Sequence, residues 1–238
     1  MQVNVLLFPG VTQLDLTGPY EVLARVPGFT VDLVSADLAP VVSDRGLILT
    51  PTASFDSARL ADVLVVPGGP GVDEAMTLAP WVDFIARQAA GARYVLGICT
   101  GALLLGAAGL LRGKRASSHW MAREFLPAFG ALPDDARICV DGSLITAGGV
   151  TSGIDMALQA VALMRDEDTA RQIQLHIEYD PAPPFPGGTP ETSPPHIVTR
   201  CREAGIARQQ ARAAAVEQAR RNLARRLEGE AARQGTAG

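Results

Sequence analysis

The chain has 238 residues, 47% of them hydrophobic and 19% charged, so it is long and apolar enough to bury a substantial core. Its formal net charge of −4 argues against nucleic acid or an anionic membrane surface as its main partner. Three cysteines do not suggest a disulfide framework, no apolar run approaches a membrane span, and residues 1–8 do not resemble a signal peptide. We therefore expect a cytoplasmic protein with no membrane partner.

Short apolar strands alternate with helical patterns as far as Tyr179. We expect strands at Val3–Phe8, Phe29–Ser35, Asp62–Val66, Tyr94–Ile98 and Lys114–Ser118, and hairpins at Val41–Leu49 and Arg137–Thr146. An amphipathic stretch ends at Val26, and helices are expected at Asp73–Ala90, Ala102–Leu111, Ser152–Arg165 and Asp166–Tyr179, with one more ending at Phe129. This alternation predicts an α/β fold whose mostly parallel central sheet is covered by helices on both faces.

The character of the sequence changes after Tyr179. Asp180–Pro195 is dense in proline and glycine, which predicts an extended segment, and the alanine- and arginine-rich stretch from His196 to Arg233 has a helical pattern. We expect a single domain over residues 1–195 and a helical tail over residues 196–238, packed on the domain or on a dimer partner. Nine arginines against four glutamates between residues 200 and 233 leave a nucleic-acid-binding tail as a less favoured alternative.

A strand, a glycine-rich turn and a helix follow one another around Cys99. The apolar run Tyr94–Ile98 leads into Gly-Ile-Cys-Thr-Gly at residues 97–101, and Ala102–Leu111 has helix-forming composition. This is the cysteine version of the nucleophile elbow, in which two glycines allow a turn that holds one side chain in a strained position. The helix N-terminus behind Cys99 predicts a lowered thiol pKa and a thiolate nucleophile; a buried structural cysteine is the alternative.

Loops at the carboxyl ends of the other strands carry groups that such a nucleophile needs. Asp15 lies between two leucines, so desolvation and a neighbouring thiolate should raise its pKa and make it a proton donor, with an Asx turn or a helix N-cap as the alternative. The backbone N–H groups of Gly69 and Thr100 are candidates for an oxyanion hole, although Pro67–Pro70 is also simply a turn. The Thr100 hydroxyl could contact the substrate or cap its own helix.

The three histidines do not suggest a metal site. His119 follows Cys99 at the end of an expected strand, where it could orient or deprotonate the thiol. A histidine beside a tryptophan is more often a packed, hydrogen-bonded residue, and we favour that interpretation. His176 and His196 pair with no cysteine or carboxylate at metal-ligand spacing, so we expect no metal.

Several motifs together resemble one known superfamily. They are Gln13–Pro19, Pro67–Gly69, Gly97–Gly101, Leu105–Leu111, Gly113–Trp120, Gly153–Asp155 and Gln174–Pro186. From about residue 3 to residue 200, the chain resembles the PfpI-type, class I glutamine amidotransferase-like superfamily and, within it, the isonitrile (isocyanide) hydratases. The likeness implies a flavodoxin-like α/β sandwich, a homodimer, no cofactor, and hydration of an isonitrile, R–N≡C, to an N-formamide.

The resemblance also implies roles for individual residues. It places the family's nucleophile on Cys99, its essential carboxylate on Asp15 and its neighbouring hydroxyl on Thr100. The glycine after the late strand falls on Gly148, whereas Val150 replaces an isoleucine and could reshape the pocket floor. The implied chemistry begins with attack of the Cys99 thiolate on the isonitrile carbon while the Asp15 carboxyl supplies a proton, and the Asp15 carboxylate then activates water.

Other interpretations of the same motifs stay open. Ligand-sensing domains of AraC-type transcription regulators share much of the Asp-x-x-Gly-Pro and Pro-Gly-Gly pattern, but the 43 residues after the proline-rich stretch are too few for two helix-turn-helix units. A peptidase, a glyoxalase-like lyase or a deglycase of the superfamily would need a hydrolytic triad or a dicarbonyl pocket. An exposed thiol of low pKa would also suit a redox sensor.

Overall fold

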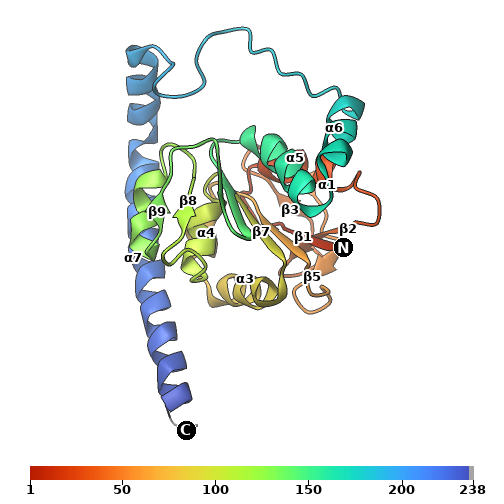
Figure 1. Ribbon diagram of the computed structural model, residues 1–238. Helices are drawn as coiled ribbons and strands as arrows, with labels where there is room; N and C mark the ends of the chain where they lie inside the picture. Colours follow the sequence, from red (N-terminus) through yellow and green to blue (C-terminus); the bar gives the residue numbers. More distant parts are fainter. Residues whose placement is uncertain (236–238) are drawn as a thin grey trace.

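The computed structural model describes residues 1–235, and its centre is a seven-stranded sheet (Figure 1). The strands lie in the order β10-β11-β7-β6-β1-β2-β5, and every neighbouring pair is parallel except β10 and β11. Their bounds are Gln2–Leu6 (β1), Thr30–Ser35 (β2), Ala53–Ser54 (β5), Val63–Val66 (β6), Tyr94–Ile98 (β7), Ile138–Asp141 (β10) and Leu144–Ala147 (β11). The expected α/β fold with a mostly parallel sheet is confirmed.

Two small sheets lie beside the large one. Strands β3 (Val41–Val42) and β4 (Ile48–Leu49) form the expected antiparallel hairpin. Strand β8 (Arg115–Ala116) pairs in parallel with β9 (Leu132–Pro133), a strand that the sequence pattern does not predict.

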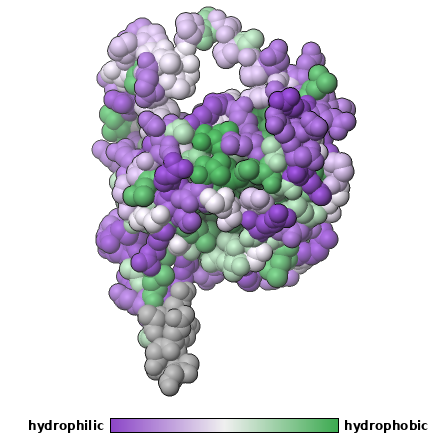
Figure 2. Space-filling model, viewed as in Figure 1, coloured by the Kyte–Doolittle hydropathy of each residue, from purple (hydrophilic) through white to green (hydrophobic). Residues whose placement is uncertain are grey.

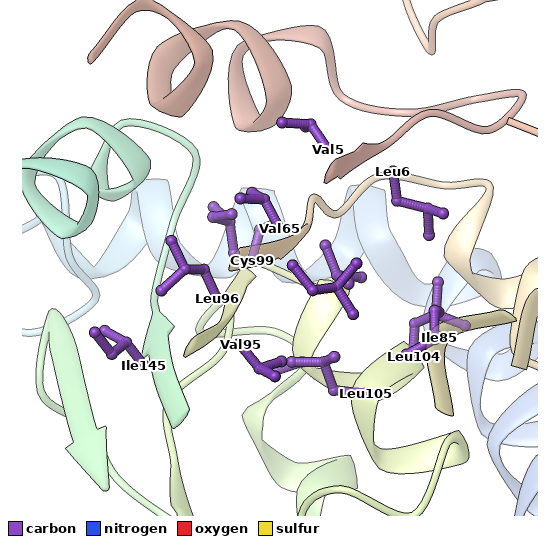
Figure 3. Close-up of a cluster of buried hydrophobic side chains, with 14 of the residues drawn as sticks. Val5, Leu6, Val65, Ile85, Val95, Leu96, Cys99, Leu104, Leu105 and Ile145 are labelled. Carbon is purple, nitrogen blue, oxygen red and sulfur yellow. The ribbon is translucent and has the colours of Figure 1, made fainter. Parts of the chain in front are cut away.

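Helices cover both faces of the large sheet (Figure 1). Helices α1 (Gln13–Leu23), α5 (Ser152–Met164) and α6 (Glu167–His176) pack together on one face, and α3 (Ala79–Gly91) and α4 (Gly101–Ala107) pack together on the other. Because both faces are covered, every residue of β1 and β6 is buried. Figure 3 shows Cys99 in the resulting apolar cluster, beside Val65 of β6 and Leu96 of β7.

Two expected helices differ from the structure. The region Asp73–Ala90 contains two helices, α2 (Val72–Ala75) and α3, because Pro80 favours the first turn of a new helix and lacks the N–H that would continue the old one. The helix expected to end at Phe129 is a 3₁₀ helix, η1 (Arg123–Phe129), which contains Pro127. The expected cap of α6 is confirmed, since Asp166 accepts a 2.7 Å hydrogen bond from the Thr169 N–H.

Helix α7 (Pro195–Gly235) runs along the side of the domain (Figure 1). It packs on its own domain, against α2, α4 and η1, where Val216, Ala219 and Leu223 are buried. The proline-rich segment before it has no regular structure, as expected. Residues 236–238 of the expected tail lie outside the described residues. No described helix is long and apolar enough to cross a membrane.

Candidate active site

Cys99 lies at the sharp turn between β7 and α4. Its backbone φ is 55°, a left-handed conformation that costs a non-glycine residue about 1–2 kcal/mol. The turn is fixed from two sides: the Cys99 N–H donates to the Ala147 carbonyl at 3.0 Å, and the Ser118 hydroxyl donates to the Cys99 carbonyl at 2.7 Å. A Cβ at Gly101 would lie 2.2 Å from the Val66 carbonyl oxygen, so only glycine lets the turn pack this closely on β6. The expected strand-turn-helix elbow is confirmed.

Asp15 is completely buried in the first turn of α1. Its Oδ2 accepts a 2.9 Å hydrogen bond from the Gly68 N–H, whereas Oδ1 is buried without a hydrogen-bond partner of ordinary geometry among the described residues. Thr12, not Asp15, is the N-cap of α1, so the N-cap alternative is wrong. Burial raises the pKa of Asp15 to about 7, and the bond from Gly68 and the contact with Cys99 lower it by less.

The Cys99 thiol shares this buried space with Asp15. Burial, followed by the negative charge of Asp15, raises the pKa of the thiol well above its ordinary value. The Thr100 N–H at the helix start and the charge of Arg212 lower that pKa, but by less. The expected lowering of the thiol pKa is therefore wrong. Burial and the neighbouring carboxylate destabilise the thiolate more than the N-terminus of α4 stabilises it. The two groups form a coupled pair.

The Thr100 hydroxyl joins the elbow to the loop after β6. It accepts a 2.9 Å hydrogen bond from the Gly69 N–H and donates to the Gly69 carbonyl at 3.2 Å. The Gly69 N–H thus donates to the Thr100 hydroxyl in this structure, and its expected oxyanion-hole role stays a prediction. A Cβ at Gly68 would lie 2.6 Å from the Thr100 nitrogen and 2.8 Å from Asp15 Oδ2, so glycine keeps open the narrow space between them.

A cavity of about 230 Å³ opens in front of Cys99. Its lining residues are Thr12, Asp44, Gly69, Pro70, Cys99, Thr100, His119, Met121, Val150, Gly205, Arg208, Gln209 and Arg212. Gly148 is not among them; it lines a neighbouring cavity of about 600 Å³ that shares His119 and Val150 with the first. The fold therefore brings together Cys99, Asp15, Thr100, Gly69 and His119. Gly148 lies outside this group, in the wall of the neighbouring cavity.

His119 is a packed, neutral residue at the cavity wall. Burial, with help from the charges of nearby arginines, lowers the pKa of His119 to about 4. Its Nδ1 accepts a 3.3 Å hydrogen bond from the Met121 N–H, and its ring lies 5.8 Å from that of Trp120. These contacts fit the favoured interpretation, in which His119 is a packed, hydrogen-bonded residue.

Helix α7 supplies part of the cavity wall that no sequence motif assigned to the site. Arg212 is only 4% exposed, and its Nε donates to Asp73 Oδ1 at 2.9 Å. Gly205, Arg208 and Gln209 line the cavity from the same helix. The sequence does indicate that these four residues belong together, because their i, i+3, i+4, i+7 spacing places them on one face of a helix. Among the described residues, no group of three or more His, Cys, Asp and Glu side chains is arranged to hold a metal ion.

Known proteins resemble this chain over most of its length. An isonitrile hydratase from Pseudomonas putida is 51% identical over 203 residues, which are 85% of this chain and 89% of that protein. The crystal structure of a THiJ/PfpI family protein from Pseudomonas syringae matches with a TM-score of 0.88 and 40% identity, covering 90% of each chain. The HTH-type transcriptional regulator CdhR from Pseudomonas aeruginosa is 30% identical over 71% of this chain but only 52% of its own length. The family model for the DJ-1/PfpI family matches residues 1–163, and the chain therefore belongs to the DJ-1/PfpI family.

Proposed function

We propose that this protein is an isonitrile hydratase, a cysteine-dependent enzyme that converts R–N≡C and water into R–NH–CHO without a cofactor. The observation that carries the proposal is the pair formed by strained Cys99 and buried Asp15, whose pKa of about 7 suits proton transfer near neutral pH. The 51% identity to an isonitrile hydratase supports the choice of substrate.

The first half-reaction uses both members of the pair. Asp15 takes the proton of the Cys99 thiol as the sulfur forms a bond to the terminal isonitrile carbon. Asp15 then gives that proton to the same carbon, which yields a thioimidate, R–N=CH–S–Cys, and a free Asp15 carboxylate. The raised pKa of the thiol makes Asp15 necessary, because few thiolates form without a base beside them.

The second half-reaction hydrates the thioimidate. The Asp15 carboxylate removes a proton from water as the oxygen adds to the carbon, and the nitrogen receives that proton. The tetrahedral intermediate then collapses to a carbonyl, the sulfur leaves, and the hydroxyl proton returns to the Cys99–Asp15 pair. One water is consumed, and the pair ends in its starting protonation state.

The test follows formamide production from cyclohexyl isocyanide by mass spectrometry, with Cys99→Ala and Asp15→Asn beside the wild type. Cys99→Ala should abolish turnover, and Asp15→Asn should lower kcat by at least about two orders of magnitude, the usual effect of losing a positioned acid–base group. Near-normal activity in Asp15→Asn would overturn the mechanism. If the wild type makes no formamide but alkylating reagents still trap Cys99, the isonitrile assignment fails while the nucleophile stands.

A sensor domain of a transcription regulator is the second candidate, favoured by the 30% identity to CdhR. Residues 195–235 form one continuous helix packed on the domain, which is not the shape of a helix-turn-helix unit. Specific DNA binding by the purified chain in a gel-shift experiment would revive this function.

We also infer a homodimer and a cytoplasmic location. Hydrophobic side chains gather in the centre of the face seen in Figure 2, and a second copy could cover them. Sedimentation at twice the chain mass of 25.0 kDa would support the dimer, and sedimentation as a monomer would overturn it. Cys99, Cys139 and Cys201 are all unpaired, which suits a reducing compartment.

A further inference from the structure

The face of α7 that packs on the domain is apolar along most of its contact but polar where it lines the catalytic cavity. Val216, Ala219 and Leu223 are buried and apolar, as packing requires. One to three turns earlier, the same face carries two arginines and a glutamine, which line the cavity together with Gly205. A helix face that only anchors the tail would remain apolar there. The polar side chains therefore need partners, either within the protein or inside the cavity.

Two of these three polar side chains, Arg212 and Gln209, already make hydrogen bonds within the protein. Arg212 donates from Nε to Asp73 at 2.9 Å and from Nη1 to Gln209 Oε1 at 2.8 Å. Gln209 in turn donates from Nε2 to the Met121 carbonyl. The Asp73 carboxylate offsets the charge of Arg212, and the set holds the wall rigid. Neither residue leaves an uncompensated charge facing the cavity.

Arg208 is different, because it is exposed at the cavity and has no ion pair among the described side chains. The other charged groups that line the cavity do not neutralise it. Asp44 lies 3.8 Å from Arg45, His119 is neutral at physiological pH, and the Cys99–Asp15 pair lies at the bottom of the site. Within the described part of the chain, Arg208 is the cavity's unpaired cation.

We propose that the α7 wall selects isonitriles whose R group ends in a carboxylate, with Arg208 as the recognition residue; this rests on the proposed function. The isonitrile carbon must reach Cys99, so the R group occupies the rest of the cavity, which Arg208 lines. A carboxylate at that end fits the planar guanidinium through paired, charge-assisted hydrogen bonds. The Asp15 carboxylate, buried beside Cys99, disfavours a second anion at the bottom of the cavity. Hydration leaves the carboxylate unchanged, so the product is an N-formyl amino acid.

The experiment compares isocyanoalkanoates of increasing chain length with their methyl esters, which have nearly the same shape and no charge. The kcat/KM of each substrate is measured for the wild type, Arg208→Gln and Arg208→Lys. The matched control is Arg225→Gln, which removes the same charge from an exposed position of α7 away from the cavity. Repeating the wild-type series at increasing ionic strength tests for a charge interaction.

We expect the acids to be preferred to the esters, and Arg208→Gln to lower kcat/KM at least about tenfold for the acids, the loss of one charged hydrogen bond. The esters should change less than about twofold, Arg208→Lys should restore part of the preference, and Arg225→Gln should match the wild type. If the kcat/KM for each acid equals that for its methyl ester, in the wild type and in Arg208→Gln alike, this inference is overturned and the proposed function stays intact. Turnover of neither class, nor of cyclohexyl isocyanide, would overturn both.

Discussion

Gly69 and Thr100 hold each other through two hydrogen bonds, with the Gly69 N–H donating to the Thr100 hydroxyl at 2.9 Å and that hydroxyl donating to the Gly69 carbonyl at 3.2 Å. The pair lies in the wall of the catalytic cavity and is buried. The Thr100 side chain therefore fixes the loop after β6 against the elbow that carries Cys99. This connection gives the hydroxyl a positioning role that can be separated from the chemistry.

Thr100→Val should destabilise the protein by about 1–3 kcal/mol, because the Gly69 N–H is left buried without a partner. Thr100→Ser keeps the hydroxyl and should lose much less stability. The kcat/KM for an isonitrile should fall in Thr100→Val and stay near wild type in Thr100→Ser. Urea unfolding and steady-state kinetics on the three proteins check this. Equal stability of the Val and Ser variants would mean that these hydrogen bonds contribute nothing.

The elbow could be predicted from the sequence because it is a local feature. A Gly-x-Cys-x-Gly turn between an apolar run and a helix needs no distant residue to be recognised. The approach of Asp15 to this turn could also be predicted, since the carboxyl ends of parallel strands meet at one edge of a sheet. Its hydrogen bond to Gly68 joins residues 53 apart in the chain, and no spacing rule specifies it.

The cavity wall and the Cys99 pKa could not be predicted in the same way. Arg212 and Asp73 are 139 residues apart, and an alanine-rich helix can pack on a domain in many positions. The helix N-terminus effect on Cys99 is readable from sequence, but it competes with burial, which depends on tertiary packing around the site. Only the folded structure decides which of the two contributions is larger.

Asp15 should make stability depend on pH. Burial raises its pKa from 3.8 to about 7, so between these values the folded protein holds a proton that the unfolded chain has released. The free energy of unfolding therefore falls as the pH rises through this range. Asp15→Asn cannot titrate, so its stability relative to wild type should increase by a few kcal/mol between about pH 4 and about pH 8.

Urea unfolding of both proteins at the two pH values measures this difference. Groups distant from Asp15 contribute equally in the two proteins and cancel. Cys99 is coupled to Asp15, but burial, the first cause of its raised pKa, is present in both proteins and keeps it a thiol over this pH range. A stability difference that stays constant with pH would show that Asp15 is not perturbed in the folded state.

His119 should be dispensable for proton transfer. Its pKa of about 4 keeps it neutral at physiological pH, and the Met121 N–H already occupies Nδ1. His119→Gln should therefore keep kcat within about tenfold of wild type, since a general base would contribute about 10²–10⁴-fold. Steady-state kinetics with an isonitrile check this. A loss of two orders of magnitude or more would favour a hydrolytic triad and the peptidase-like alternative.

Backbone strain at Cys99 can be measured with two inactive variants. At φ 55° a glycine has no steric penalty, whereas alanine keeps the Cβ that makes this conformation unfavourable. Cys99→Gly should therefore be more stable than Cys99→Ala by about 1 kcal/mol in urea unfolding, the reverse of the usual order. Cys139 is the matched control, because it is buried in the extended strand β10, where alanine should be the more stable replacement. If alanine is favoured at both positions, the elbow does not store backbone strain at Cys99.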